Sequence, residues 1–454
     1  MPAFKVIVVG AGPVGLVAGH CLTHAGIEFE ILERRDDFDL NAGASTALWP
    51  DNVRVLDQLG LLDEARTLRI PYHSKICIRS DGSQISRSRM LAAVEELHGH
   101  PWMLFHRGEL VDLLRRRLPE SSTRIHTGKV VQSIQTNDKG ITVTCADDTT
   151  HTGSMILGVD GVNSTIRRLI ASQPTVPAAQ KPSNTTPRPP PMKSSYVGLY
   201  GHSAYIPGAM EEGCFYETHA RDMTFQVGVA APTDKCYFAC FKRLPHPTTA
   251  QHTFTDSEKD AFAASLADVH ATTSLTFREL YARAQWSHMA YIEEGVATSP
   301  WSSDRIVLAG DAAHKMTPNA GLGLNCGIQS VVVLVNQLRW LLVQKPDSEP
   351  GEEALMGVFR AYEAERRKPA AEMVKLSATA MRAPAWRNRV WRFVDQYVLP
   401  RIGGDMLVLR YVFAMVVREG VPLDFLEERA FKEGTNGVRV VLINEFTVTG
   451  VVPV

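Results

Sequence analysis

The feature that most constrains the fold of this 454-residue chain is a glycine-rich turn near its start. The run from Lys5 to Val9 is rich in β-branched residues and is typical of a buried parallel strand, and Gly10, Gly12 and Gly15 follow it before a helical stretch ending near Ala25. In such a turn the first glycine allows a tight bend, the second lets the backbone approach a pyrophosphate, and the third lets helix and strand pack closely. The helix N-terminus then meets the negative charge. The sequence therefore predicts an α/β nucleotide-binding fold.

An acidic residue follows the next predicted strand, residues 28–32. Glu33 stands at about the spacing after the glycines at which a carboxylate binds a ribose hydroxyl in dinucleotide folds. Strand, turn, helix, strand and acid occur in the order that the motif needs. The pattern does not separate a nicotinamide dinucleotide from a flavin one.

A second glycine-rich segment, Gly310-Asp311-Ala312-Ala313-His314, favours the flavin. It follows the apolar run 306–308, so Asp311 stands at a strand end where it could hold a ribityl hydroxyl. The loop 317–325 then opens a helix whose free N–H groups suit the carbonyl oxygens of a flavin ring, or a ring that becomes anionic on reduction.

A third motif lies between these two. Residues 155–159 form an apolar predicted strand, and Asp160-Gly161 follows it, with Ser164 and Arg167 beyond. An acid at the end of a parallel strand fits a cofactor site. An ordinary Asp-Gly turn is the alternative interpretation.

The three motifs, in this order, resemble those of the class A flavoprotein monooxygenases, the p-hydroxybenzoate hydroxylase superfamily. Within it, the chain is most similar to the fungal FAD-dependent epoxidases of meroterpenoid and indole-alkaloid pathways. That finer likeness is carried by Gly43-Ala44-Ser45-x-x-Leu48-Trp49-Pro50, Arg54 to Gly60, His314 to Asn319, and Pro422 to Leu426.

The resemblance implies a set of FAD contacts: Gly10, Gly12, Gly15, Glu33, Ala47, Arg107, Asp160, Asp311 and Leu324. Ala47 and Leu324 stand where the epoxidases usually carry glycine, so close backbone approach is less easy there. Arg107 also has a physical rationale, because a guanidinium binds a pyrophosphate bidentately. An exposed arginine at a helix start is its alternative interpretation.

The resemblance also implies an arginine and a tyrosine as catalytic candidates in the substrate domain. Val197 stands at the apparent arginine position, which questions the epoxidase mechanism in this chain. Tyr216 matches the tyrosine and is the predicted catalytic residue, donating a hydrogen bond from its phenol. A tyrosine packed in a sheet is the alternative.

The implied reaction is that of a single-component monooxygenase. NADPH or NADH reduces FAD, and a flavin C4a-hydroperoxide formed with O₂ epoxidises or hydroxylates an apolar or aromatic small molecule in secondary-metabolite biosynthesis. The alternatives are a phenol or aromatic-ring hydroxylase, a flavin reductase or dehydrogenase of the same fold, and a flavin-bound partner protein without enzymatic activity.

Composition agrees with an enzyme of this kind. An apolar content of 44% supports a substantial core, and a net charge of −1 gives no electrostatic argument for nucleic acid. Seven cysteines, an odd number without a CxxC pair, favour a reducing cytosol and no metal site. Oligomeric state stays open.

Nothing in the sequence has the length of a membrane span. No run reaches the roughly 18 uninterrupted apolar residues required. The best candidate, Met406 to Val417, is interrupted by Arg410 and predicts either core packing or contact with a membrane surface. We therefore expect a cytoplasmic protein and leave membrane association open.

The order of predicted elements gives an α/β architecture. We expect a discontinuous Rossmann-like FAD-binding domain of the p-hydroxybenzoate hydroxylase type, an antiparallel-sheet substrate domain, and a mainly helical C-terminal region. Their expected ranges are 1–70, 101–170 and 296–345 for the first, 71–100 and 171–295 for the second, and 346–454 for the third. Residues 171–195 contain seven prolines and predict an irregular loop, and 438–454 predict β-structure.

Overall fold

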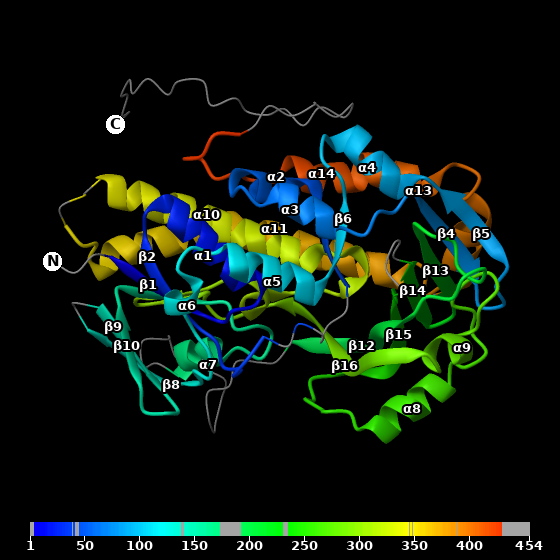
Figure 1. Cartoon of the computed structure of the whole chain (residues 1–454), viewed down its shortest axis with the longest axis horizontal. Helices are drawn as coiled ribbons and strands as arrows, with labels where there is room; N and C mark the ends of the chain where they lie inside the picture. The colour runs from blue at the N-terminus through cyan, green and yellow to red at the C-terminus, as the bar shows by residue number, and fades with distance from the viewer. Residues whose placement is uncertain are drawn as a thin grey trace.

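The computed structural model has an elongated arrangement, in which long helices lie along one side of two sheet regions (Figure 1). The structure describes residues 4–38, 40, 45–137, 140–172, 192–229, 235–344, 346, 348–386 and 388–428. The predicted proline-rich loop falls mostly, and the predicted terminal β-segment wholly, outside the described residues.

A six-stranded, largely parallel sheet holds the glycine turn. Its strand order is β17 (Ser302–Ser303), β18 (Ile306–Leu308), β11 (Met155–Gly158), β1 (Lys5–Val9), β2 (Glu28–Leu32) and β7 (Ile125–His126). β1 pairs in parallel with both β2 and β11, and β11 pairs in parallel with β18. The three motif loops therefore leave neighbouring strands at the same edge, which is where open α/β sheets bind ligands.

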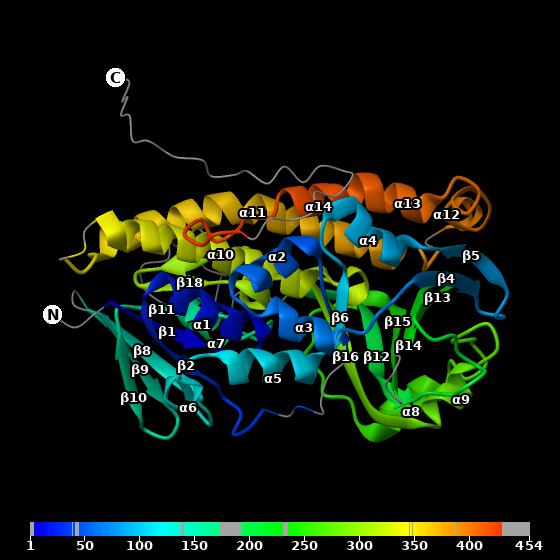
Figure 2. The same cartoon turned by 45° about the horizontal axis from the view of Figure 1, so that its top comes forward.

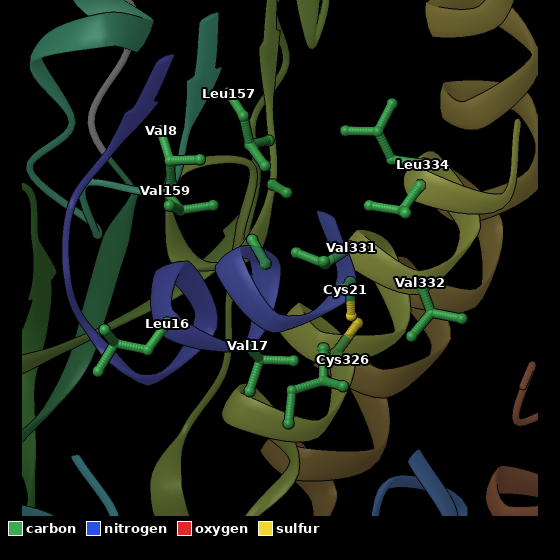
Figure 3. Close-up of a cluster of buried hydrophobic side chains, with 14 of the residues drawn as sticks. Val8, Leu16, Val17, Cys21, Leu157, Val159, Cys326, Val331, Val332 and Leu334 are labelled. Atoms are coloured by element: carbon green, nitrogen blue, oxygen red, sulfur yellow. The ribbon is translucent and has the colours of Figure 1, made fainter. Parts of the chain in front are cut away.

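Two apolar helices pack beside this sheet. Figure 3 shows part of the core that joins the strands to α1 (Pro13–Ala25) and α10 (Leu322–Gln344). The core side chains shown there include Val8 and Leu157 from the strands, Leu16 and Val17 from α1, and Val331 and Leu334 from α10, all fully or almost fully buried. α10 is long and apolar enough to cross a membrane, but its most apolar window is 67% buried within the protein. Such a helix is ordinary for the core of a soluble enzyme.

Smaller elements complete this part of the molecule. A three-stranded sheet consists of β8 (Val131–Asn137), β9 (Gly140–Cys145) and β10 (Thr150–Gly153), and β3 (Ser45–Leu48) pairs with β6 (Met103–His106). The helices are α2 (Pro50–Gln58), α3 (Leu62–Leu68), α4 (Met90–His98), α5 (Arg107–Arg117), α6 (Ser121–Arg124) and α7 (Thr165–Ser172).

An eight-stranded sheet forms the second region. Its order is β19 (His314–Lys315), β16 (Ala284–Val296), β12 (Lys193–Ala204), β15 (Lys235–Thr248), β14 (Met223–Val229), β13 (Cys214–Ala220), β4 (Ser74–Arg79) and β5 (Gln84–Ser88). All pairs are antiparallel except β13 with β4. One face packs with α8 (Asp256–Ala264) and α9 (Phe277–Tyr281) around a second hydrophobic core. Because β19 begins at His314, the last residue of the third motif, the edge of this sheet is joined to the motif loop.

The described C-terminal region is helical, as predicted. α11 (Glu352–Arg382) runs beside α10, and α12 (Arg389–Phe393), a π-helical turn (Val394–Val398), α13 (Gly404–Leu407), a second π-helical turn (Val408–Phe413) and α14 (Ala414–Arg418) follow. Figure 2 shows α14, α13 and α12 in succession along the top of the molecule. In Met406–Val417, Leu409 and Phe413 are buried in the main core, which agrees with the predicted core packing, whereas other side chains are exposed.

Candidate active site

Steric constraints at the first turn explain its glycines. Gly10 has φ +110°, a backbone conformation that disfavours other residues. A Cβ added to Gly15 would lie 1.9 Å from the carbonyl oxygen of Gly10, so this position packs helix against strand. A Cβ at Gly12 would meet nothing within 4 Å. Gly12 is the N-cap of α1 and provides no side-chain cap, which leaves the first N–H groups of the helix available to a ligand.

The Glu33 carboxylate is held beside this turn. It accepts hydrogen bonds from the backbone N–H of Ala11 at 2.8 Å and of Arg35 at 3.0 Å. Glu33 lines a cavity of about 200 Å³ together with Gly10, Gly12, Asp160 and basic residues that include Arg34, Arg35, Arg107 and Lys129. The cavity therefore joins an acid suited to a hydroxyl with cations suited to phosphate.

The structure gives Asp160 a clear structural role. Its carboxylate accepts hydrogen bonds from the Ser164 hydroxyl and from the N–H groups of Thr165 and Ile166, and so caps the start of α7. Arg167 then donates to the carbonyl oxygen of Ala312, 2.6 Å away. This contact ties the middle motif to the third one.

A second cavity, of about 390 Å³, continues from the first. Gly12, Arg107, Val159 and Gly161 line both cavities. The second is also lined by the predicted residues Ala47, Asp311 and Leu324. Burial, and secondarily the charge of Arg35, lower the pKa of Arg107 from its ordinary value.

Asp311 forms an ion pair with Lys315, four residues further along the chain. Burial by itself lowers the pKa of Lys315. The negative charge of Asp311 and its hydrogen bond outweigh this effect, so the pKa of Lys315 is raised. A cationic lysine and an anionic aspartate thus sit together on the wall of the second cavity. Lys315 was not predicted as a site residue.

Asn325 fixes the loop that precedes it to residues 47–49. Its side-chain amide nitrogen donates to the carbonyl oxygens of Ala47 at 2.8 Å and Gly321 at 2.6 Å, and its oxygen accepts from the backbone N–H of Trp49 at 2.8 Å. A Cβ on Gly321 would lie 2.8 Å from the Ala47 Cβ, so the alanine side chain packs directly against this turn. Asn325 belongs to the predicted loop, but the hydrogen bonds by which it bridges two segments could be recognised only in the structure.

A third cavity, of about 610 Å³, adjoins the second. The two share Ser45, Gln226, Lys315, Met316 and Pro318. The third is otherwise lined mainly by the eight-stranded sheet, including Tyr200, Ala239, Phe241, His288 and Tyr291. Its wall is therefore partly aromatic and partly polar.

Strand alternation separates Tyr216 from these cavities. Tyr216 is 1% exposed in the second core, where its hydroxyl accepts a hydrogen bond from the N–H of Glu211, and burial raises its pKa to about 12. Its neighbour Phe215 lines the second cavity instead. The structure thus places Tyr216 in the second core and not among the residues that line the three cavities, and its catalytic role stays a prediction.

The position of Val197 is also explained by alternation. Val197 and Leu199 belong to the second core, whereas Tyr200 lines the third cavity. Val197 is therefore a core residue in this structure. Burial raises the pKa of Tyr200, while the nearby cations of Lys315 and Arg107 oppose this. The alternation of side chains along the strand places Tyr200 on the same face as Tyr196 and Gly198. It does not tell which of the two faces lines the cavity.

Residues 3–377 match the family model described as the FAD binding domain. The chain belongs to this FAD-binding family. The FAD-dependent monooxygenase srdH of Neurospora crassa is 32% identical over 433 residues, covering 93% of this chain and 96% of that protein. The FAD-dependent monooxygenase atmM of Aspergillus flavus is 28% identical over 400 residues, covering 87% and 82%. The protein is thus an FAD-dependent monooxygenase by family.

Two solved structures share the fold. Klebsiella pneumoniae HpxO complexed with FAD and uric acid superposes with a TM-score of 0.68 at 19% identity, covering 89% of this chain and 96% of that one. FqzB gives a TM-score of 0.70 at 19% identity over 91% and 93%. The predicted fold class is confirmed.

The residues of the first two cavities fit the FAD that the family binds. The uncapped start of α1, with open space beyond Gly12, suits a pyrophosphate. All predicted cofactor residues except Gly15 line these cavities: Gly10, Gly12, Glu33, Ala47, Arg107, Asp160, Asp311 and Leu324. Gly15 acts through packing, and the individual contacts to FAD stay predictions.

Proposed function

We propose that the protein binds FAD across the two connected cavities and oxygenates a small molecule held in the third. NADPH or NADH would supply two electrons, one atom of O₂ would enter the substrate, and the other would leave as water. FAD supplies the redox and oxygen-activating chemistry when bound. The adjoining third cavity is the observation that carries the proposal, because an organic molecule bound there would lie beside the loop that we propose binds the flavin ring.

The chain's own groups have separate roles in this proposal. Glu33 would bind the ribose, Arg107 and the start of α1 the pyrophosphate, and Asp311 the ribityl chain. The loop ending at Asn325 would present its N–H groups to the ring. These contacts orient the cofactor toward the third cavity.

The lining of the third cavity supports an apolar or aromatic substrate. Ala239, Phe241 and Tyr291 provide apolar and ring surface, while Gln226 and Tyr200 provide polar groups. A wall of this kind binds mainly by apolar contact and orients with a few hydrogen bonds. We propose epoxidation or hydroxylation of such a molecule in secondary metabolism.

The test begins with anaerobic mixing of FAD-loaded protein and NADPH or NADH while the flavin absorbance is followed. Air and a panel of prenylated, indolic and phenolic compounds are then added, and reductant consumption and product are measured together. We expect a compound that accelerates flavin reduction and gives product in proportion to the reductant consumed. Reduction followed only by hydrogen peroxide with every compound would favour a reductase or dehydrogenase of the same fold.

A further inference from the structure

The C-terminal helices carry an unusual set of exposed apolar side chains. We call these residues the C-terminal apolar face. They are Val390, Trp391, Phe393, Tyr397, Ile402, Leu407, Val408, Tyr411 and Met415, each between 38% and 69% exposed. They lie on α12, α13, α14 and the turns between them, which follow one another along the top of the molecule in Figure 2. Exposed large apolar side chains that lie on consecutive helices in this way mark an interaction site.

Helical periodicity places part of this set in one stripe. Leu407, Tyr411 and Met415 recur every four residues and point outward, whereas Leu409 and Phe413 are buried in the main core. The helical stretch is therefore apolar on both sides. A helix of that kind is normally covered on both sides, and here the protein covers only one.

Most of the exposed charges on this stretch are positive. Within the described part of 388–419, the exposed charged residues are five arginines and one acid: Arg389, Arg392, Arg401, Arg410, Arg418 and Glu419. The other two acids of this stretch form ion pairs with the eight-stranded sheet, where Asp395 contacts His219 at 2.8 Å and Asp405 contacts Lys75 at 3.4 Å. A chain with a net charge of only −1 thus concentrates positive charge on this one surface.

We propose that the C-terminal apolar face docks on the anionic surface of a lipid bilayer. Aromatic and aliphatic side chains flanked by arginines are the composition of helices that lie in the membrane interface. The arginines would face lipid phosphates while the stripe enters the acyl boundary. A second copy of this chain is a poorer occupant, because a two-fold contact would bring the same arginines together.

The face is rigidly attached to the eight-stranded sheet. Glu217 on β13 forms ion pairs with Lys75 at 2.8 Å and with His219 at 3.3 Å. Lys75 also pairs with Asp405, and His219 also pairs with Asp395. Buried ion pairs of this kind fix geometry. Docking would therefore set the orientation of the sheet that lines the third cavity. The docking itself does not depend on which reaction occurs there.

The test is flotation of the full-length, FAD-loaded protein with vesicles of phosphatidylcholine alone or mixed with phosphatidylserine. We expect binding to the mixed vesicles, weaker binding to phosphatidylcholine alone, and loss of binding as salt rises. Phe393→Ser with Tyr411→Ser, and separately Arg389→Glu with Arg401→Glu, are each expected to lower the vesicle-bound to free ratio by about tenfold or more.

Trp340→Ser is the matched control. Trp340 is 65% exposed on α10, outside the face, so its variant is expected to bind as the wild type does. Thermal unfolding and flavin content confirm that every variant is folded. The proposal is overturned if wild-type protein ignores mixed vesicles, if Trp340→Ser loses binding equally, or if the protein is a dimer that only the face variants dissociate.

Discussion

The side chain of Gln226 is hydrogen-bonded to the backbone of Asn319: its Nε2 donates to the Asn319 carbonyl oxygen 3.2 Å away. The same nitrogen donates to a carboxylate oxygen of Glu217 at 2.8 Å. Two acceptors on one side fix which end of the amide is nitrogen. Since Gln226 lines the second and third cavities, the group that it offers to a ligand there is its oxygen, an acceptor.

Replacing Gln226 by leucine should therefore loosen the loop at Asn319. We expect the free energy of unfolding to fall by about 1–3 kcal/mol, because the Glu217 carboxylate and the Asn319 carbonyl each lose a donor. Chemical denaturation measures this. Gln135→Leu, at an exposed position of β8, is the matched control and should change stability little. Equal stability of the Gln226 variant and wild type would show that the bonded amide contributes nothing.

Asp311→Ala should weaken FAD binding by about tenfold or more, since a charge-assisted hydrogen bond is lost. The flavin-to-protein absorbance ratio after gel filtration reports the effect. Asp268→Ala is the control, because this side chain is 91% exposed and pairs only with Arg278 at the surface. Full flavin content in the Asp311 variant would refute the cofactor site.

Tyr216→Phe and Tyr200→Phe should separate packing from cavity function. The first variant should keep the ratio of product to reductant consumed, while unfolding about 1 kcal/mol more easily, because only the hydrogen bond from the Glu211 N–H is lost. The second should lower product yield, because Tyr200 lines the third cavity. A loss of coupling confined to Tyr216→Phe would restore its predicted catalytic role.

His314 predicts a specific loss of stability in acid. This side chain is fully buried, and burial together with the charge of Arg366 lowers its pKa to about 4. The unfolded chain binds the proton more readily, since the ordinary value is 6.5, so stability falls as pH drops from 6.5 toward 4. Between pH 7 and pH 5 we expect a loss of about 2 kcal/mol that His314→Gln does not show. Parallel pH curves of the two proteins, obtained from denaturant unfolding, would contradict this assignment.

Local patterns predicted the nucleotide-binding elements well. The strands β1, β2 and β18 have the predicted bounds, because each is a short, mostly apolar run closely followed by a residue of a motif. Asp311, Arg107 and Glu33 follow such signals directly. The structure brings all three to the walls of the connected cavities.

Faces of the large sheet could not be predicted in this way. Nearly every residue of β13 and β14 is buried, whichever face of the sheet it occupies. The alternation of side chains along these strands therefore does not tell which face lines a cavity. The sequence could not tell for this reason that Tyr216 lies in the second core. Gln226 and Lys315 were missed because their roles depend on partners that the fold brings together from Glu217, Asn319 and Asp311.

The central claim is that FAD and an organic substrate meet at the boundary between the second and third cavities. The most direct test is turnover of the FAD-loaded protein under ¹⁸O₂ with a compound that accelerates NADPH or NADH oxidation. Mass spectrometry should find one ¹⁸O atom in the product, and Tyr200→Phe should reduce that labelled yield without reducing flavin content. Product without ¹⁸O, or labelled hydrogen peroxide as the only oxygen product with every compound, would contradict oxygen transfer at this site.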